Sequence, residues 1–318
     1  MHSSVPMAEA RFEVLEVGPH VSVQDAGRPG LMRYGVPGSG PMDRLSHAIA
    51  NVALGNAEGA PGIEVSVRGL ALRCVAGPVT VAVAGGGFVV TLDGVRSVSW
   101  GVLTVQAGQW LRIAAGHWGS WTYLGFAGGL LARDWLGSVA THAMSGAGGG
   151  MLKPGQVVRV AAPRVVPERR LVCPVGARPR ALLHVVMGPQ DRFFDAAAMA
   201  TLLGEPFRLS DSYDRMGVRL RGPSLTPVAR LDMPSEPVAR GSVQVAGDGV
   251  ATVLLADHQT TGGYPKIATV LGDDLDGFAQ LRPRDLVRFV AVTPAQAVVL
   301  ARQHAVLRAK VLAGVARR

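Results

Sequence analysis

One stretch of this chain concentrates residues that can do chemistry. After an apolar run, the ten residues read Asp257-His258-Gln259-Thr260-Thr261-Gly262-Gly263-Tyr264-Pro265-Lys266. An imidazole, hydroxyls and an ammonium so close together could transfer a proton and bind an anion. The Gly-Gly pair lets the backbone adopt positive φ or lie close to another group. The alternative is a corner between two strands whose polar side chains only satisfy local backbone groups.

Two other polar loops accompany this stretch. Gln24 to Asp43 contains a run rich in glycine and proline, Gly35 to Pro41, that cannot form regular structure. Ser210 to Arg219 is the third loop, for which a solvated turn is a reasonable alternative. Loops that Gly and Pro fix on a rigid barrel commonly carry binding groups.

The elements that must hold these loops are mostly short strands. Ile63 to Ala115 reads as six strands separated by glycine-containing turns, a pattern typical of a barrel or sandwich. Helices are expected after Asp43, over Asp191 to Leu203, and over Ala295 to Val315, where Thr293-Pro294 forms the start signal. The fold class is therefore mainly β with few helices.

The second half of the chain repeats the first. Three matches share one ungapped shift of 176 positions: Gly86-Gly87-Phe88 with Gly262-Gly263-Tyr264, Trp110 to Ile113 with Leu286 to Phe289, and Ser66-Val67 with Ser242-Val243. Arg33 to Val36 also matches Arg215 to Val218 at a slightly different shift. These matches keep the same order, which favours a tandem duplication of one all-β unit. The first copy, Gly85 to Phe88, lacks the His, Lys and hydroxyls of the second.

The duplication sets the expected domain boundaries. Residues 11–162 form an N-terminal β-barrel, 163–179 a linker rich in proline and arginine, 180–292 a C-terminal β-barrel, and 293–318 a C-terminal helix. A length of 318 residues agrees with two domains.

Composition excludes several classes of function. The net charge of +9 comes from scattered arginines, and the aromatic residues, 5% of the chain, are not interleaved with them, so nucleic-acid binding is not expected. There is no P-loop motif, no histidine pair at metal-ligand spacing and no apolar run that could span a membrane. Cys74 and Cys173 lie far apart in apolar settings, which fits a reducing cytoplasm.

Four stretches carry a resemblance to a known family: Val23-Gln24-Asp25-Ala26-Gly27-Arg28-Pro29-Gly30, Gly35 to Asp43, Asp214-Arg215-Met216-Gly217, and Thr260 to Ile267. In that order they resemble the biotin-dependent carboxyltransferase family, also known as the allophanate hydrolase subunit 2 family. It includes the Kip antagonist and the C-subunit of the bacterial 5-oxoprolinase. The resemblance runs from about residue 12 to 292.

The resemblance implies two cyclophilin-like β-barrels in tandem, in agreement with the repeat. It implies a heteromeric complex with a partner known as subunit 1, or a Kip-inhibitor-like protein, and ATP with Mg²⁺ used at the level of that complex. Related domains of urea carboxylase transfer a carboxyl group from biotin. This chain has no Ala-Met-Lys-Met sequence, so it is not expected to carry biotin itself.

The chain departs from the family in two places, one of which is the absence of the expected glutamate-arginine pair between Gly148 and Pro154. The family usually has Gly-Ser-Arg-Ser-Thr where this chain has Gly137-Ser138-Val139-Ala140-Thr141. If that arginine contacts substrate in relatives, its replacement by Val139 means a different substrate or weaker binding.

Residue types and resemblance together predict a subunit of an ATP-dependent amidohydrolase that acts on 5-oxoproline. Phosphorylation of a lactam carbonyl oxygen creates a leaving group, and cations stabilise the charge that develops. We expect Arg28, Arg215 and Lys266 to stabilise charge, and His258 or Asp257 to transfer a proton. The expected substrate-binding residues are Asp25, Arg28, Thr260, Thr261, Gly262, Gly263 and Tyr264, with the threonines and glycine amides forming an anion nest.

Two alternatives come from other classes of function. One is the carboxyltransferase component of a biotin-dependent urea or amide carboxylase. The other is a regulatory protein that binds and sequesters a kinase inhibitor.

Overall fold

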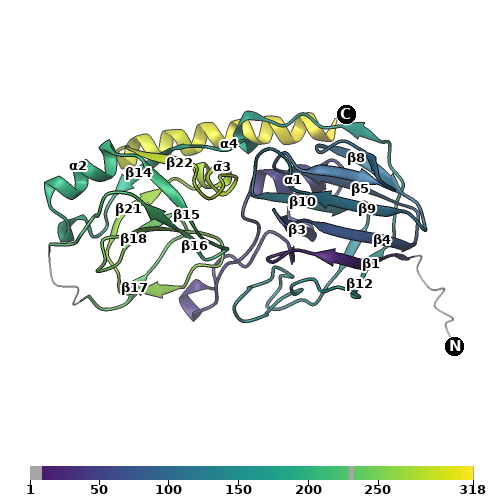
Figure 1. The fold of residues 1–318 in the computed structure, drawn as a ribbon, viewed down its shortest axis with the longest axis horizontal. Helices are drawn as coiled ribbons and strands as arrows, with labels where there is room; N and C mark the ends of the chain where they lie inside the picture. The colour runs from purple at the N-terminus through teal and green to yellow at the C-terminus, as the bar shows by residue number, and fades with distance from the viewer. Residues whose placement is uncertain (1–8, 229–232, 318) are drawn as a thin grey trace. The chain divides into compact units, whose positions relative to one another are not determined.

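The computed structural model describes residues 9–228 and 233–317. The chain divides into two compact units (Figure 1). Unit 1 contains Arg44–Val175 together with the stretch that ends at Gly27 and the one that begins at Val311. Unit 2 contains Arg28–Asp43 and Gly176–Lys310. The loop at 28–43 thus belongs to the unit that the second half of the sequence builds.

Unit 1 consists of two antiparallel sheets, with α1 packed on β10 and β5. The strand orders are β11-β12-β1-β4-β9-β6-β7 and β13-β8-β5-β10-β3-β2. The rings of Phe12 and Phe126 lie 5.5 Å apart in its apolar core. The elements are β1 Glu9–Val17, β2 Ser22–Gln24, α1 Arg44–Val52, β3 Gly62–Ser66, β4 Leu70–Ala76, β5 Val79–Ala84, β6 Val89–Leu92, β7 Val95–Arg96, β8 Gly101–Val105, β9 Trp110–Ala114, β10 Trp121–Phe126, β11 Gly129–Leu131, β12 Val157–Ala161 and β13 Arg169–Arg170.

Unit 2 is built on a closed barrel with the strand order β14-β21-β18-β19-β16-β15-β22. The alternating burial of β22 places Val287 and Phe289 in the core, and the ring of Phe289 packs 6.0 Å from that of Phe207. The elements are η1 Met32–Tyr34, β14 Leu182–Met187, η3 Asp191–Phe193, α2 Ala196–Gly204, β15 Phe207–Tyr213, β16 Gly217–Arg221, β17 Glu236–Pro237, β18 Ser242–Val245, β19 Ala251–Leu254, β20 Thr261–Gly262, β21 Lys266–Val270, α3 Asp274–Ala279 and β22 Leu286–Ala291; η2 Val175–Ala177 and α4 Pro294–Ala316 extend across the boundary of the two units.

Side-chain caps start two helices, and the cap at Thr293 was predicted from the sequence. The helix expected over Asp191 to Leu203 is divided into η3 and α2, and α2 begins after Asp195. The carboxylate of Asp195 accepts a hydrogen bond from Ala198 N at 2.8 Å at the start of α2. At α4, Thr293 Oγ1 accepts from Gln296 N, and Gln296 Oε1 accepts from Thr293 N, which forms a reciprocal cap. Across 9–228 and 233–317, no helix has both the length and the apolar composition needed to cross a membrane.

The mainly β class is confirmed, but three details of the expected domain organisation differ from the structure. Unit 1 forms two sheets, and the closed barrel is found in unit 2. The expected linker 163–179 contains β13, which pairs with β8 through Arg169 and Val102 and so belongs partly to a sheet. Segment 28–43, placed in the first barrel from the sequence, groups with unit 2. Contiguous boundaries fail because long-range hydrogen bonds, and not chain order, assign a loop to a unit.

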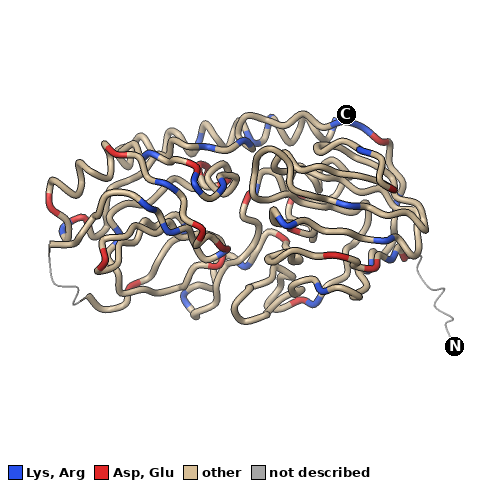
Figure 2. The backbone as a smooth tube through the Cα atoms, viewed as in Figure 1, with Lys and Arg blue, Asp and Glu red and all other residues tan. Residues whose placement is uncertain are grey.

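The expected duplication stays a prediction. Trp110 to Ile113 and Leu286 to Phe289 both lie in strands, β9 and β22. Arg33, in contrast, lies in the 3₁₀ turn η1, whereas its counterpart Arg215 precedes strand β16. Basic and acidic residues are interspersed along the backbone of both units (Figure 2).

Candidate functional site

The stretch 257–266 leaves the barrel after β19 and returns to it at β21. Its first residues, Asp257 and His258, are buried. The chain then forms the short strand β20, which pairs with β17 through Thr261 and Gly262. The strands β17 and β20 therefore form a two-stranded flap on unit 2. The pairing holds the polar side chains of the stretch 257–266 in defined positions.

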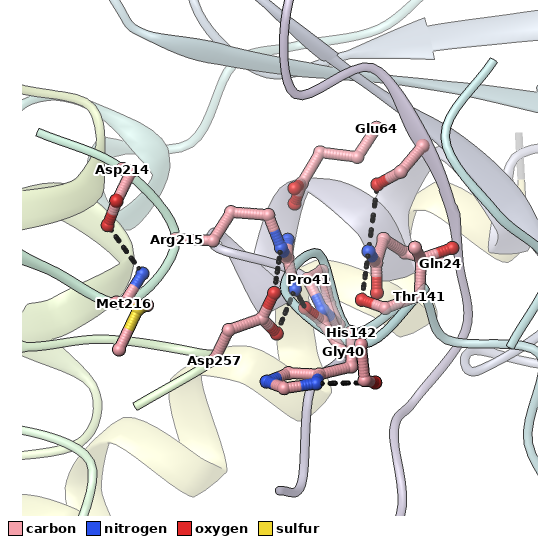
Figure 3. A network of polar contacts seen from close by, with 12 residues as sticks. Gln24, Gly40, Pro41, Glu64, Thr141, His142, Asp214, Arg215, Met216 and Asp257 are labelled. Atoms are coloured by element: carbon pink, nitrogen blue, oxygen red, sulfur yellow. Dashed lines mark hydrogen bonds and ion pairs between the residues drawn. The ribbon is translucent and has the colours of Figure 1, made fainter. Parts of the chain in front are cut away.

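A buried ion pair anchors the start of this stretch. Arg215 donates from Nε and Nη2 to the two carboxylate oxygens of Asp257, both at 2.9 Å, and each side chain is 1% exposed (Figure 3). Asp257 N also donates to Arg215 O at 2.8 Å. Two parallel charge-assisted bonds fix orientation as well as distance. A proton-transfer role for Asp257 would require this pair to open, so the geometry favours a positioning role for both residues.

Segment 28–43 supplies acceptors to the same unit. Arg28 is 2% exposed, and its backbone N donates to Gly38 O at 2.7 Å, which folds the loop onto itself. The loop then offers a series of oxygen atoms to unit 2: Gly40 O to Arg215, Pro41 O and Met42 O to Arg240, and Asp43 Oδ2 to Gln280. The predicted residues Arg28 and Arg215 therefore belong to one unit despite their separation in sequence.

The surroundings of His258 favour a neutral imidazole that can accept a proton. Its Nδ1 lies 2.7 Å from Gln259 O, and because a carbonyl can only accept, Nδ1 carries the hydrogen and Nε2 is the basic nitrogen. Burial is the largest cause that lowers the pKa of His258, the charge of Arg240 lowers it further, and the Gln259 carbonyl and Asp257 oppose the shift. The neutral imidazole needed by a general base is therefore favoured.

Lys266 is a buried cation whose ammonium forms no hydrogen bond to the described residues. Its side chain is 2% exposed, and within 9–228 and 233–317 no acceptor lies at hydrogen-bond distance from Nζ; Glu236 Oε2 lies 3.7 Å away. The backbone of Lys266 is fixed by Gln190, whose Oε1 accepts from Lys266 N and whose own N donates to Lys266 O, both at 3.1 Å. A buried ammonium that lacks acceptors is costly in a folded protein, which is typical of a group kept for a ligand.

Two amides beside Lys266 were missed from the sequence. Gln259 Nε2 donates to Gln244 Oε1 at 2.9 Å, whereas Gln244 Nε2 has no acceptor in the described part of the chain. Gln244 is 5% exposed and lies between Val243 and Val245 in β18. A polar residue in a buried apolar strand was the signal that could have identified it.

The remaining predicted binding residues differ in how deeply they are buried. Thr260 is half-buried and its carbonyl accepts from Val238 N, Thr261 is exposed, and Tyr264 is 51% exposed. Neither Gly262 nor Gly263 has positive φ, so the expected anion nest, which requires a left-handed residue, is not formed. Gly262 instead permits a close approach: a Cβ built on it would lie 2.8 Å from Gln244 Nε2.

Asp25 belongs to unit 1 and not to the unit of the other predicted site residues. Its carboxylate accepts from Gly27 N at 2.9 Å, Ser138 Oγ at 2.5 Å and Val139 N at 2.8 Å. Nearby in unit 1, Gln24 Nε2 donates to Thr141 O (Figure 3). Asp25 thus fixes the segment that contains Val139.

Potential metal ligands do not gather in the described part of the chain. Within 9–228 and 233–317, no three His, Cys, Asp or Glu side chains converge on one point. The use of ATP with Mg²⁺ at the level of the complex stays a prediction.

Fold and site together define a mainly β protein whose closed barrel carries a buried cationic site. Residues 34–291 match the family model for the carboxyltransferase domain, subdomains A and B. The chain belongs to this family.

Individual relatives extend the comparison. The 5-oxoprolinase C-subunit of Haemophilus influenzae is 32% identical over 296 residues, which cover 92% of this chain and 95% of that protein. The crystal structure of TTHA0988 is 34% identical with a TM-score of 0.80 and covers 90% of this chain and 56% of that one. The Kluyveromyces lactis urea carboxylase is 27% identical with a TM-score of 0.85, over 98% of this chain and 30% of that one. The chain thus spans about half the length of TTHA0988 and less than a third of the length of the Kluyveromyces lactis urea carboxylase.

Proposed function

We propose that this chain is a subunit of an ATP-dependent complex that hydrolyses a lactam or amide C–N bond, of the 5-oxoprolinase type. The similarity to the 5-oxoprolinase C-subunit along nearly the whole of both chains supports this proposal. The observation that carries it is the buried Nζ of Lys266, a positive charge that no described residue meets with a hydrogen-bond acceptor. Such a fixed charge stabilises an anionic group of a bound substrate without reorganisation.

In this proposal, each residue of the unit 2 site has a separate role. Lys266 binds the anionic group of the substrate, and His258 Nε2 accepts or returns a proton at the reacting centre. The Arg215–Asp257 pair holds the start of the flap, and so keeps His258 in place. Thr260 and Thr261 belong to the same flap, with Thr261 in β20.

ATP and Mg²⁺ act at the level of the complex in this proposal, and the complex also contains the subunit 1 or Kip-inhibitor-like protein. ATP supplies the phosphoryl group that makes the lactam oxygen a leaving group. This chain carries no biotin, and the complex is proposed to act in the cytoplasm, in keeping with the free Cys74 and Cys173.

A second candidate function is carboxyl transfer. It is favoured by the family model itself and by the fold shared with urea carboxylase over 98% of this chain. In that case the complex would require a biotin-carrier protein, and its activity would depend on carboxybiotin.

The test is co-expression with the subunit 1 protein, followed by ATP hydrolysis assays with 5-oxoproline, allophanate and urea. We expect turnover with 5-oxoproline, a strong loss in Lys266→Ala and His258→Ala complexes, and no loss in Lys153→Ala, which changes an exposed lysine of unit 1. Wild-type turnover in both site variants would show that the site assignment is wrong. A stoichiometric complex with no turnover on any substrate would favour the regulatory alternative.

A further inference from the structure

Two buried nitrogen donors in unit 2 have no acceptor among the residues that the structure describes. These are Nζ of Lys266 and Nε2 of Gln244, whose side chains are 2% and 5% exposed. Buried polar groups in native proteins are nearly always hydrogen-bonded, and each one left unsatisfied destabilises the fold. Two such donors in neighbouring strands indicate a bound acceptor that the described chain does not supply.

A β-bulge places the two donors opposite one another. Ser242 pairs with Thr269 and Val243 with Ala268, and continuing that register would set Ile267 opposite Gln244. The ladder shifts at this point, and Lys266 occupies the position instead. Directly opposed residues leave a sheet on the same face with Cβ atoms about 5 Å apart. The bulge therefore pairs an ammonium with an amide where a regular strand would present an apolar side chain.

The surrounding side chains hold both donors in position. Gln259 Nε2 donates a hydrogen bond to Gln244 Oε1. This bond fixes the orientation of the Gln244 amide, with its nitrogen directed away from the bond. Gln190 binds the Lys266 backbone and also donates from Nε2 to Glu236. Glu236 is 38% exposed and stays 3.7 Å from Nζ, so it lowers the net charge without using the ammonium hydrogens.

The number and charge of the donors select the ligand. A neutral carbonyl offers one oxygen and no charge, whereas a carboxylate offers two oxygens and compensates Lys266. A phosphate dianion would need more donors, and the Glu236 carboxylate would repel its double charge more strongly than the single charge of a carboxylate. Gly262 lets the backbone lie close to the amide, because a Cβ there would meet Gln244 Nε2 at 2.8 Å and Gln259 Nε2 at 3.3 Å.

We propose that Lys266 and Gln244 form a carboxylate-binding site, each donating to one oxygen of a small planar monoanion. This inference rests on the proposed function only for the identity of the ligand, the carboxylate of 5-oxoproline. It assigns Lys266 to recognition of that carboxylate, and leaves activation of the lactam carbonyl to groups outside this donor pair.

The experiment is isothermal titration calorimetry of the full chain, alone and with subunit 1, against 5-oxoproline, 5-oxoprolinamide and acetate. We expect 5-oxoproline to bind about tenfold or more tightly than its neutral amide, because a hydrogen bond to a charged group contributes at least this factor. Lys266→Met and Gln244→Glu should each weaken 5-oxoproline binding about tenfold or more, whereas Lys153→Met should not change it. Lys266→Met removes a buried charge, and Gln244→Glu preserves shape, so each is expected to fold. Circular dichroism checks this.

Acetate binding that depends on Lys266 supports a general carboxylate site. Equal affinity for 5-oxoproline and its amide, an unchanged Lys266→Met variant, or no binding of any carboxylate by the chain and by the complex would overturn the proposal. Turnover by the complex is a separate readout. A complex that hydrolyses 5-oxoproline equally with Lys266→Met keeps the proposed function and removes this site. If the chain binds carboxylates in a complex that shows no turnover, the carboxylate site is supported and the proposed function is contradicted.

Discussion

Two Gly-Gly pairs that align at the shift of 176 positions, Gly86-Gly87 and Gly262-Gly263, use glycine for different purposes. In unit 1, Gly85 and Gly86 have positive φ, Trp100 Nε1 donates to Gly86 O at 2.8 Å, and Gly87 N donates to Trp118 O at 2.9 Å. Aromatic side chains therefore close this turn. In unit 2, Gly262 has an extended backbone and lies against the Gln244 amide, whose nitrogen meets no acceptor in the described ranges. The same residue pair serves packing in one unit and access to polar groups in the other.

The largest expected effect follows from breaking the buried ion pair that supports the unit 2 turn. Asp257→Ala leaves Arg215 buried without its counter-ion, which should lower the free energy of unfolding by about 3–5 kcal/mol. Asp248→Ala is the matched control, because the Arg219–Asp248 pair is about half exposed and should contribute about 1 kcal/mol or less. Urea unfolding of both variants measures the difference. Equal losses would show that burial does not distinguish the two pairs.

Adding a methyl group to the unit 1 turn tests its packing role. A Cβ on Gly87 would lie 2.4 Å from Trp118 Nε1, so Gly87→Ala should destabilise the protein by about 1–3 kcal/mol through overpacking. Binding of 5-oxoproline by the folded fraction should stay at the wild-type level. Thermal unfolding and calorimetry check the two parts, and weakened binding would contradict the division of roles.

The same methyl group in the unit 2 turn should act mainly on binding. Gly262→Ala crowds the Gln244 amide, and we expect 5-oxoproline affinity to fall about fivefold, equivalent to ~1 kcal/mol. The change in unfolding free energy should be smaller than that of Gly87→Ala, because the flap is partly exposed. A stability loss without any change in affinity would make the two turns equivalent.

The smallest effect is a pH dependence at His258. Its pKa is lowered from the ordinary value of 6.5, mainly by burial. The unfolded chain therefore binds this proton more tightly, so the free energy of unfolding should rise with pH between the lowered folded pKa and 6.5, and level off above it. His258→Gln should remove this slope. Urea midpoints at several pH values test the prediction, and an unchanged slope in the variant would assign it to another group.

The secondary structure could be predicted well where the local pattern is strong. Most strands between Ile63 and Ala115 and the helix that follows Thr293-Pro294 occur as expected, but β7 Val95–Arg96 was not predicted and the strand expected from Ser97 begins only at Gly101. Part of the site was also found this way, since Lys266 and His258 lie in a short stretch of unusual polarity. Gln244 was missed, because its place in an apolar strand marks it as unusual but does not show whether its amide has an acceptor. The ion pair of Asp257 could not be predicted, because its partner Arg215 lies far away in the sequence.

The sequence by itself determined the family, the mainly β class and the stretch 257–266 as the place where polar groups gather. Periodicity, turn residues and motifs are local properties, so they are readable without a fold. Only the tertiary structure decided that segment 28–43 belongs to unit 2, and that a bulge sets Lys266 opposite Gln244. Strand register and long-range hydrogen bonds are fixed by closure of the barrel, and a one-residue shift there changes which side chain faces which.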